Sequence, residues 1–454
     1  MTVNDHDIVV PVVDEGLGNS AYLVDLGDGR ALVIDPTRDL RQIDDATRKR
    51  GLMITTAAET HLHADFVSGA TRLSARDGAR VLGSAAGGRE FPHVGLHDSQ
   101  EFDLGGMRLQ AWTTPGHTPE HLAYLLLDGD ETLAVFTGGS LIVGAAARTD
   151  LVSPDQTEPL ARAQFHALQR LAQLPDHTPV FPTHGAGSFC SAPPGADRVS
   201  TIGQEKAGNP LLRIEDEDQF VTALLGSLGS FPPYFLRLGE VNRRGPAIPS
   251  DTPLAALSVV EVLALRDRGA EIIDVRPVTD YASGHVPGAL SIELRPAFAT
   301  WLGWLVPNAD TPLVVLRNAE QDVNEVAWQA RKIGYDSVVG ELTGGIAAWR
   351  AAGQPLLTTT LIDPREANPE QLLDIRQRNE YTASHSPAAA HAELGSLVNA
   401  DLAVGPIVTM CGHGERAASA ASVLERAGRT DLGILVGGPD DWAKAAKQAL
   451  VSEP

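Results

Sequence analysis

The chain has 454 residues, of which 43% are hydrophobic and 21% charged; it is globular in composition but too long for one core, so two to four domains are expected. Its formal net charge of −22 disfavours nucleic acid and anionic membrane as partners, because basic patches supply the affinity for both. No segment has the features of a signal peptide or a membrane helix, and two cysteines are too few for a disulfide framework, so a cytoplasmic protein is expected.

Residues 1–235 are predicted to form one unit in which strands alternate with helices. Its expected strands are residues 8–13, 21–26, 31–34, 52–55, 81–83, 107–113, 122–127 and 133–136, and its expected helices are 40–50, 67–79 and 158–174. Polar loops that contain histidines follow several of these strands. This pattern predicts sheets packed as a sandwich and covered by helices.

Residues 236–256 contain Arg, Gly and Pro and are predicted to be a linker. The remainder of the chain is an approximate repeat of two copies, residues 257–357 and 358–454. Both copies contain an Asp-x-Arg segment, then a histidine, an apolar strand and a late Gly-Gly-x-x-x-Trp: Asp274–Arg276, His285, 313–316 and Gly344–Trp349 in the first, and Asp374–Arg376, His385, 406–410 and Gly437–Trp442 in the second. Strand and helix patterns alternate, which predicts a parallel α/β domain for each copy.

The segment Glu59-Thr-His-Leu-His-Ala-Asp-Phe66 is the strongest chemical signal of the first unit. Its two histidines and its aspartate offer metal ligands from one loop, because neutral imidazole binds metal ions near pH 7. His117 and His184 lie in further loops that contain Gly and Pro. A lone histidine is more often retained by packing, and packing without a metal is the alternative here, but several histidines in this arrangement favour a metal site.

The first unit resembles the metallo-β-lactamase superfamily, with His61, His63 and Asp65 at its first motif, His117 at the second and His184 at the last. Further segments resemble persulfide dioxygenases fused to rhodanese domains: Thr114–His121, Arg148–Leu151, His184–Ser188 and Ser200–Lys206. This resemblance implies an αββα sandwich followed by two rhodanese-like parallel α/β domains.

In that group a single iron is held by two histidines and an aspartate in a Thr-Gly-Asp turn. The turn here is Thr137-Gly-Gly139-Ser140, which lacks the carboxylate. One metal ion is therefore expected, held by His61, His63 and His117: Fe(II) by the resemblance, or Zn(II), which suits three imidazoles.

Phe66 stands where binuclear hydrolases of the superfamily have a histidine, so a second metal is not expected. Asp65 is predicted to act as an acid or base or to orient a ligand, and His184 to orient a ligand or contact substrate. Arg148 is predicted to lie behind a metal ligand or to contact substrate, such as an anionic thiol like glutathione. Asp150 belongs to the Arg-Thr-Asp segment and is given little weight as a replacement ligand.

Cys411-Gly-His-Gly-Glu-Arg416 lies between an apolar strand and an Ala-rich helix, residues 417–427. A thiol at this junction faces the N-terminus of the helix, which favours the nucleophilic thiolate. The loop residues Gly412, His413, Gly414 and Glu415 are expected to direct N–H groups at the sulfur, and Arg416 to hold an anionic sulfur donor. The loop resembles the reactive loop of rhodaneses, which implies a persulfide on Cys411; a buried, inert cysteine is the alternative.

The first copy of the repeat has no cysteine in its corresponding loop, Leu316–Gln321, and is predicted to have a structural or docking role. Cys190 is a possible second thiol that receives or holds a persulfide, with packing as the alternative.

The leading hypothesis is persulfide metabolism: a persulfide dioxygenase-like front domain with an impaired iron site, coupled to a sulfurtransferase at Cys411. Its expected partners are a low-molecular-weight thiol persulfide, thiosulfate or sulfite, and the resemblance implies a homo-oligomer. One alternative is a metal-dependent thioester hydrolase that resembles glyoxalase II. Another is a sulfurtransferase whose front domain only binds a thiol or a partner.

Overall fold

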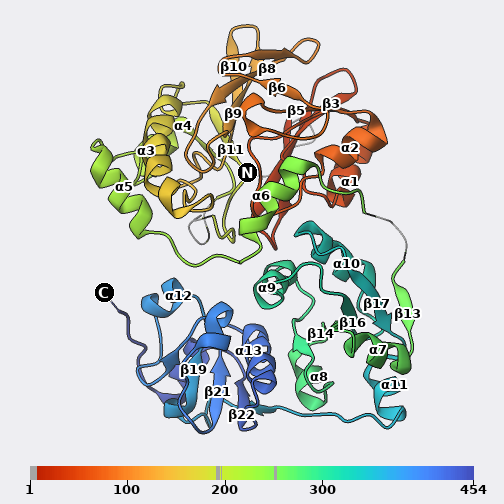
Figure 1. Cartoon of the computed structure of the whole chain (residues 1–454). Helices are drawn as coiled ribbons and strands as arrows, with labels where there is room; N and C mark the ends of the chain where they lie inside the picture. Colours follow the sequence, from red (N-terminus) through yellow and green to blue (C-terminus); the bar gives the residue numbers. More distant parts are fainter. Residues whose placement is uncertain (1–7, 191–194, 196, 250–252, 454) are drawn as a thin grey trace. The chain divides into compact units, whose positions relative to one another are not determined.

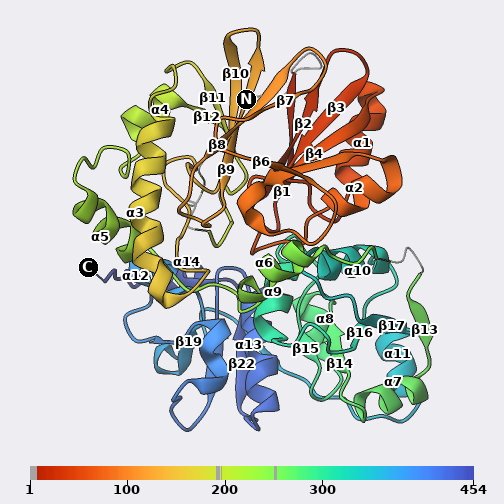
Figure 2. The ribbon, with the colours of Figure 1, turned by 45° about the horizontal axis from the view of Figure 1, so that its top comes forward.

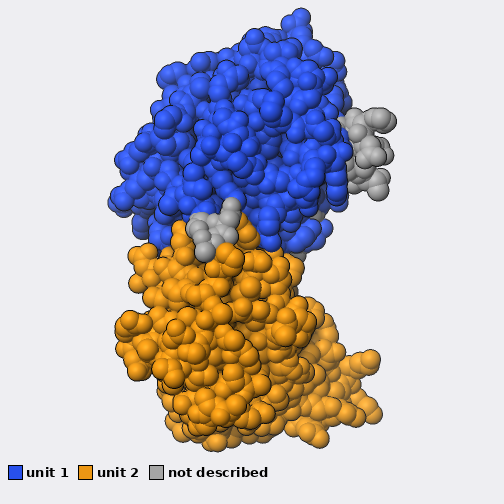
Figure 3. All heavy atoms as spheres, turned by 90° about the vertical axis from the view of Figure 1, so that its right-hand side faces the viewer, with its two compact units in different colours: residues 1–250, 331–334 blue, residues 251–330, 335–454 orange. Residues whose placement is uncertain are grey.

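The computed structural model describes residues 8–190, 195, 197–249 and 253–453. The chain divides into two compact units, coloured separately in Figure 3: residues 1–250 with 331–334, and residues 251–330 with 335–454. Among the described residues no helix is long and apolar enough to cross a membrane.

Two six-stranded mixed sheets form the centre of unit 1 (Figures 1 and 2). The first has the order β1-β2-β3-β4-β5-β6 and the second β12-β11-β10-β9-β8-β7. Apolar side chains from both sheets, including those of Tyr22, Leu32, Tyr124 and Phe136, pack into one core. The strands are β1 (Val9–Asp14), β2 (Asn19–Asp25), β3 (Arg30–Ile34), β4 (Met53–Ala58), β5 (Arg80–Ser84), β6 (Val94–Leu96), β7 (Glu101–Asp103), β8 (Arg108–Thr113), β9 (Leu122–Asp128), β10 (Glu131–Gly138), β11 (Pro179–Pro182) and β12 (Ser200–Thr201).

Helices cover the outer face of each sheet. Ile43 of α1 and Leu73 of α2 pack on the first sheet, whereas Phe165 of α3, Ile202 of α4 and Phe220 of α5 pack on the second. This confirms the αββα sandwich that the resemblance implied. The helices of unit 1 are α1 (Arg41–Arg50), α2 (Ala70–Asp77), the short 3₁₀ helix η1 (Ala85–Gly87), α3 (Pro154–Leu171), α4 (Ile202–Gly208), α5 (Glu217–Gly226) and α6 (Phe235–Arg244).

The segment predicted to be a linker, residues 236–256, differs from that expectation at both ends. Its first part belongs to α6, which begins at Phe235 and buries Phe235, Leu238 and Asn242. Its last two residues lie in β13. The apolar side chains spaced three residues apart explain the helix, because they share one face that packs on unit 1.

Unit 2 contains two five-stranded sheets, in each of which all strand pairs are parallel. Their orders, β13-β17-β16-β14-β15 and β18-β22-β21-β19-β20, are the same arrangement used twice. This confirms the two predicted parallel α/β copies, while their boundaries at 257–357 and 358–454 stay a prediction. The late tryptophans of the repeat, Trp349 and Trp442, are buried in the two cores.

The first copy consists of β13 (Ala255–Leu257), α7 (Val259–Arg266), β14 (Glu271–Asp274), α8 (Val278–Ser283), β15 (Leu290–Ser291), α9 (Phe298–Leu305), β16 (Leu313–Leu316), α10 (Val323–Lys332), β17 (Val338–Leu342) and α11 (Gly345–Ala351). The second consists of β18 (Thr360–Ile362), η2 (Pro369–Gln371), β19 (Leu372–Asp374), α12 (Arg378–Ala383), β20 (Ala390–His391), η3 (Leu394–Asn399), β21 (Ile407–Met410), α13 (Glu415–Arg426), β22 (Leu432–Leu435) and α14 (Pro439–Ala446).

Candidate metal centre and reactive loop

Three histidines that are far apart in sequence meet in the interior of unit 1. His61 follows β4, His117 precedes β9 and His184 follows β11. The three histidines meet because the two sheets bring these strand ends together. All three side chains are fully buried. One ring nitrogen of each lies within 4.8 Å of the others, and the Nε2 atoms of His61 and His184 are 3.3 Å apart.

The other ring nitrogen of each of these histidines is already hydrogen-bonded. His117 Nδ1 lies 2.7 Å from the carbonyl oxygen of Arg148, which can only accept, so the proton is on Nδ1. His117 Nε2 is then a buried acceptor, and it has no hydrogen-bond partner among the described residues. His61 Nδ1 lies 2.9 Å from Thr60 Oγ1. Imidazoles that bind metals are typically oriented in this way, by a hydrogen bond to the distal nitrogen.

Asp65 and Asn19 orient His184. The Asp65 carboxylate lies 3.2 Å from His184 Nδ1 and accepts a 2.8 Å hydrogen bond from Asn19 Nδ2. This places Asp65 behind a candidate ligand, which is one of the two roles predicted for it.

The buried histidines differ in protonation. Burial lowers the pKa of His61 well below its ordinary value and that of His117 to about 3, so both are neutral. Burial acts in the same direction on His184, but Cys190 and Asp65 outweigh it and raise the pKa of His184 well above its ordinary value. Without a metal, His184 Nε2 can therefore donate to His61 Nε2, and a metal ion would displace that proton.

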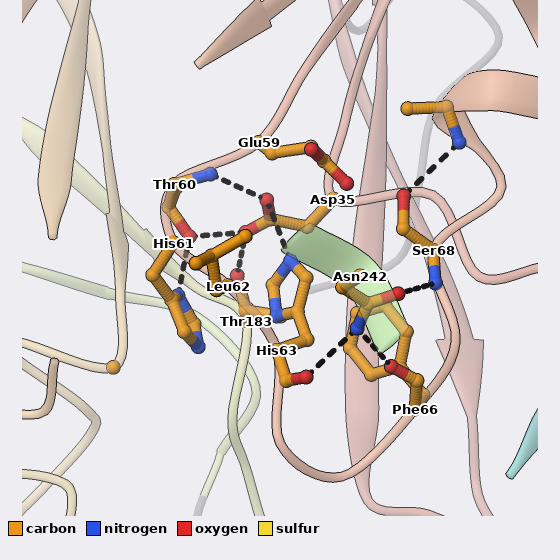
Figure 4. Close-up of polar contacts among 12 residues, drawn as sticks. Asp35, Glu59, Thr60, His61, Leu62, His63, Phe66, Ser68, Thr183 and Asn242 are labelled. Atoms are coloured by element: carbon orange, nitrogen blue, oxygen red, sulfur yellow. Dashed lines mark hydrogen bonds and ion pairs between the residues drawn. The ribbon is translucent and has the colours of Figure 1, made fainter. Parts of the chain in front are cut away.

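His63, a predicted ligand, points to a different part of the cluster (Figure 4). Its Nε2 atom lies 3.1 Å from Asp35 Oδ1 and its ring stacks on Phe66 with centroids 4.1 Å apart. It belongs to two other possible metal-binding sets, one with Asp35 and His61 and one with Asp65 and His184. The structure thus brings all the predicted ligands together, and it places His184 rather than His63 with His61 and His117.

Asp35 was not predicted to belong to the site. It follows β3, has the left-handed backbone angle φ of 48°, and is fully buried. Its carboxylate accepts hydrogen bonds from the N–H and hydroxyl groups of Thr60 at 2.7 and 2.6 Å, and from the hydroxyl of Thr183 (Figure 4). Burial raises its pKa, but His63 and these donors outweigh burial, so the pKa falls and the carboxylate stays charged. A carboxylate directly after a buried strand was the available sequence signal.

Asn242 of α6 holds the His63 loop from the other side (Figure 4). Its Nδ2 atom donates to the carbonyl oxygens of His63 and Phe66, both at 2.8 Å. Its Oδ1 atom accepts from the N–H of Ser68 at 2.9 Å. One amide side chain therefore fixes three backbone groups of the loop that begins at His61.

Gly139, in the turn where the resemblance implied an aspartate, is closely packed. A Cβ atom at this position would lie 2.4 Å from His117 Cδ2, so the His117 ring occupies the space of a side chain. The Gly139 N–H donates to His121 Nε2 at 3.0 Å, and the His121 ring stacks on His61. His121 lies in the same sequence motif as His117, but it was not predicted as a site residue, because its contribution depends on these contacts.

The structure places Arg148 behind His117, whose Nδ1 atom donates to the Arg148 carbonyl oxygen at 2.7 Å. Its guanidinium is buried and donates to the Asp150 carboxylate at 2.7 and 2.8 Å and to the carbonyl oxygens of Phe189 and Gly229 at 3.0 and 2.8 Å. These bonds leave no exposed positive charge for an anionic thiol. The Asp150 carboxylate takes part in the same ion pair.

Cys190, the possible second thiol, lies beside the cluster. It is fully buried, and its Sγ atom is 4.0 Å from Asp65 Oδ2. Its position allows either of the roles considered from the sequence, a thiol near the metal or a packing residue.

The reactive loop in unit 2 has the expected junction between strand and helix. Cys411 follows β21 directly, and α13 begins at Glu415. The Cys411 Sγ atom accepts a 3.1 Å hydrogen bond from the Gly414 N–H. Gly414 has a φ of 108°, a conformation that favours glycine. His413 is exposed, Gly412 and Glu415 are half-buried, and Cys411 is fully buried, so a donor can reach the sulfur only if the loop moves.

Arg416 is paired across the same domain. Its guanidinium makes two contacts with the Glu380 carboxylate, at 2.6 and 2.8 Å. Arg416 Nη2 lies 3.7 Å from the position of a Cβ at Gly412, so the charge borders the loop. Binding of an anionic donor by Arg416 is therefore expected to use a guanidinium that is already oriented by a carboxylate.

In the cysteine-less loop, backbone carbonyl groups rather than N–H groups bind the side chain that follows the strand. Arg317 follows β16 as Cys411 follows β21, and its Nη1 atom donates to the carbonyl oxygens of Asn318, Ala319 and Gln321. Its Nε atom lies 2.5 Å from Glu341 Oε2. Loop carbonyls thus surround a cation where loop N–H groups would surround a sulfur anion.

Comparison with known proteins divides the chain in the same way, into a front domain and two later copies. Residues 14–184 match the Metallo-beta-lactamase superfamily model, and residues 258–352 and 357–445 each match the Rhodanese-like domain model. The hydroxyacylglutathione hydrolase of Acidiphilium cryptum is 33% identical over 181 residues, which are 39% of this chain and 69% of the relative. The persulfide dioxygenase ETHE1 of Mus musculus is 29% identical over 204 residues, 43% of this chain and 73% of the relative.

A solved metallo-beta-lactamase from Staphylococcus aureus is similar over a longer stretch. It is 27% identical with a TM-score of 0.67, and the match covers 73% of this chain and 98% of the solved one. A match over 73% of the chain is longer than the front domain, so the similarity extends into the rhodanese-like part.

Proposed function

Because this chain belongs to the metallo-beta-lactamase superfamily and has two rhodanese-like domains after that domain, we propose that it is a sulfurtransferase of persulfide metabolism with Cys411 as the nucleophile. The observation that supports this most directly is the hydrogen bond from the Gly414 N–H to Cys411 Sγ at the start of α13. Backbone N–H groups and a helix N-terminus at a sulfur atom favour its anionic form.

The proposed reaction has two halves. In the first, the Cys411 thiolate attacks the sulfane sulfur of thiosulfate; the Cys411 S–S bond forms, the sulfur–sulfur bond of thiosulfate breaks, and sulfite leaves with the electron pair. In the second, an acceptor thiolate attacks the outer sulfur, forms a new persulfide and releases the Cys411 thiolate. The loop N–H groups stabilise the negative charge on sulfur in both halves.

We propose that the front domain holds one metal ion through His61, His117 and His184. The residues fit such an ion, since His117 Nε2 is buried with no hydrogen-bond partner in the part of the chain that the structure describes, and each distal nitrogen is hydrogen-bonded. When bound, the ion would supply Lewis-acid chemistry as Zn(II), or oxygen chemistry on a low-molecular-weight persulfide as Fe(II). The glycine at 139 supports an iron site without the carboxylate, and hence an impaired dioxygenase.

A thioester hydrolase remains the second candidate, and the similarity to hydroxyacylglutathione hydrolases favours it. Phe66 and Gly139 weigh against it, because neither offers a ligand for a second metal. Asp65, fixed between His184 and Asn19, is placed to orient the site in either reaction.

The test is thiosulfate-dependent sulfur transfer by the full chain, followed by sulfite release. Cys411→Ser should abolish it, and Cys190→Ser should leave it intact. Equal turnover in wild type and Cys411→Ser would refute the assignment. Hydrolysis of a glutathione thioester, with no sulfite released by any form of the chain, would favour the hydrolase instead.

A further inference from the structure

The helix behind the reactive loop, α13, is bound along one face by the cysteine-less copy. Ser419 Oγ donates to the carbonyl oxygen of Ser291 at 2.6 Å, and Ser422 Oγ accepts from the Ser291 N–H at 3.2 Å. Near the end of the helix, the Glu425 carboxylate lies 2.9 Å from His285 Nε2 and accepts from the Gly288 N–H at 3.2 Å. These helix positions are three apart and therefore lie on the same side of α13.

The contacts continue to the start of the helix, beside Cys411. Arg295 of the cysteine-less copy lies 3.9 Å from Glu415, the first residue of α13. The guanidinium carbon of Arg416 lies 5.5 Å from the centroid of the Trp301 ring, which belongs to α9 of that copy. Trp301 is only 7% exposed, so its ring is fixed by its surroundings.

The Arg416 guanidinium is consequently held by both copies. Glu380 of the last copy binds it through two hydrogen bonds, and Trp301 of the cysteine-less copy packs beside it. A cation within ~6 Å of an indole centroid is attracted to the ring. The two hydrogen bonds to the carboxylate orient the guanidinium, and the adjacent ring restricts its movement further.

We propose that Trp301 is a positioning residue of the sulfurtransferase site: it holds the Arg416 charge beside Cys411, so that anionic sulfur donors react in preference to neutral ones. This deepens the proposed function of Cys411 and rests on it. The cysteine-less copy then forms one side of the reactive site, although it has no nucleophile of its own.

The experiment measures alkylation of Cys411 in the full chain, resolved from Cys190 by mass spectrometry of peptides. Two reagents of similar size are compared, the anion iodoacetate and the neutral iodoacetamide. Loop opening affects both rates equally, so the ratio of anionic to neutral rates reports the positive charge near the sulfur. Trp301→Leu should lower this ratio about 2- to 30-fold, the range that corresponds to one cation–π contact.

Three further variants make the result decisive. Arg416→Gln should lower the ratio at least as much, and Trp301→Phe, which keeps an aromatic face, should largely retain it. Trp349→Phe is the matched control, because Trp349 is a buried tryptophan of the same copy whose ring lies 5.8 Å from the guanidinium carbon of a different arginine, Arg266, and it should not change the ratio. An unchanged ratio in Trp301→Leu, or in Arg416→Gln, would overturn the proposal.

The positioning role and the sulfurtransferase assignment can fail separately. If wild type transfers no sulfur from thiosulfate, the proposed function fails, while the alkylation ratio still measures the effect of Trp301 on Arg416. If transfer occurs and Trp301→Leu raises KM for thiosulfate while kcat is retained, both stand. If Trp301→Leu does not fold, Trp301→Met, an apolar side chain without an aromatic face, takes its place. A lowered ratio in Trp301→Met, with the Trp349→Phe ratio unchanged, supports positioning, and a wild-type ratio in Trp301→Met contradicts it.

Discussion

Replacing Gly139 by alanine should disturb the candidate metal centre through His117. The added Cβ would lie 2.4 Å from His117 Cδ2 and 2.8 Å from its Cγ, whereas carbon atoms in contact are about 3.5–4.0 Å apart. The ring would have to move by roughly 1 Å, which strains the 2.7 Å hydrogen bond to the Arg148 carbonyl and withdraws Nε2 from the cluster. Overpacking of this kind costs about 1–3 kcal/mol.

Two measurements check this expectation: the free energy of unfolding from denaturant titration, and the metal content per chain after loading with Zn(II) or Fe(II). Gly239→Ala is the matched control, since Gly239 lies inside α6 and, apart from the backbone of that helix, no atom of the described residues lies within 4 Å of a Cβ at this position. It should leave the metal content unchanged and stabilise the chain by up to about 1 kcal/mol. Wild-type stability and metal content in Gly139→Ala would refute the reasoning. Gly139→Asp adds the same Cβ, so it should lose metal as well and gain no oxygen uptake with a persulfide.

Burial raises the pKa of Glu380, but the ion pair with Arg416 lowers it by a larger amount, so the pKa lies below its ordinary value. The pair therefore stabilises the fold at pH values above about 4.3, the pKa of an unfolded Glu. Glu380→Gln should therefore lower the free energy of unfolding at pH 7 by at most about 1 kcal/mol, because the pair is partly exposed. The difference in stability from wild type should vanish as the pH falls below about 4.3 and Glu380 becomes protonated. A difference in stability that persists at low pH would contradict this account. Zn(II) in a hundredfold excess over Kd should stabilise wild type by about 2.7 kcal/mol, whereas His117→Ala should gain much less in thermal scans, and an equal gain would exclude His117 as a ligand. Arg317→Cys in a Cys411→Ser background should restore no sulfur transfer, because carbonyl oxygens rather than N–H groups face that position; sulfite release above the Cys411→Ser level would disprove the structural account of this loop.

The sequence was most informative where a motif and its secondary structure coincide. The His61–Asp65 loop after a buried strand, and Cys411 between a strand and a helix, could be identified from order and spacing alone. The two parallel copies followed from the alternation of strands and helices. In each case neighbours in sequence are also neighbours in space.

The sequence was least informative where function depends on contacts between distant segments. His184 joins His61 and His117 only because the ends of β4 and β11 and the start of β9 lie at the same place, and no spacing reveals that His63 turns to Asp35 instead. Arginine side chains are usually exposed, whereas a carboxylate and two carbonyl groups hold the Arg148 guanidinium in the interior. The packing of His117 against Gly139 is likewise visible only in three dimensions.

The place of Asn242 has a practical consequence for dividing this chain into separately expressed parts. A cut after residue 235, at the end of the predicted first unit, would remove the amide that binds the carbonyl groups of His63 and Phe66 and the N–H of Ser68. Buried polar groups left without partners cost about 1–3 kcal/mol each. A front fragment intended to fold and bind metal alone must therefore extend at least through Arg244, the last residue of α6.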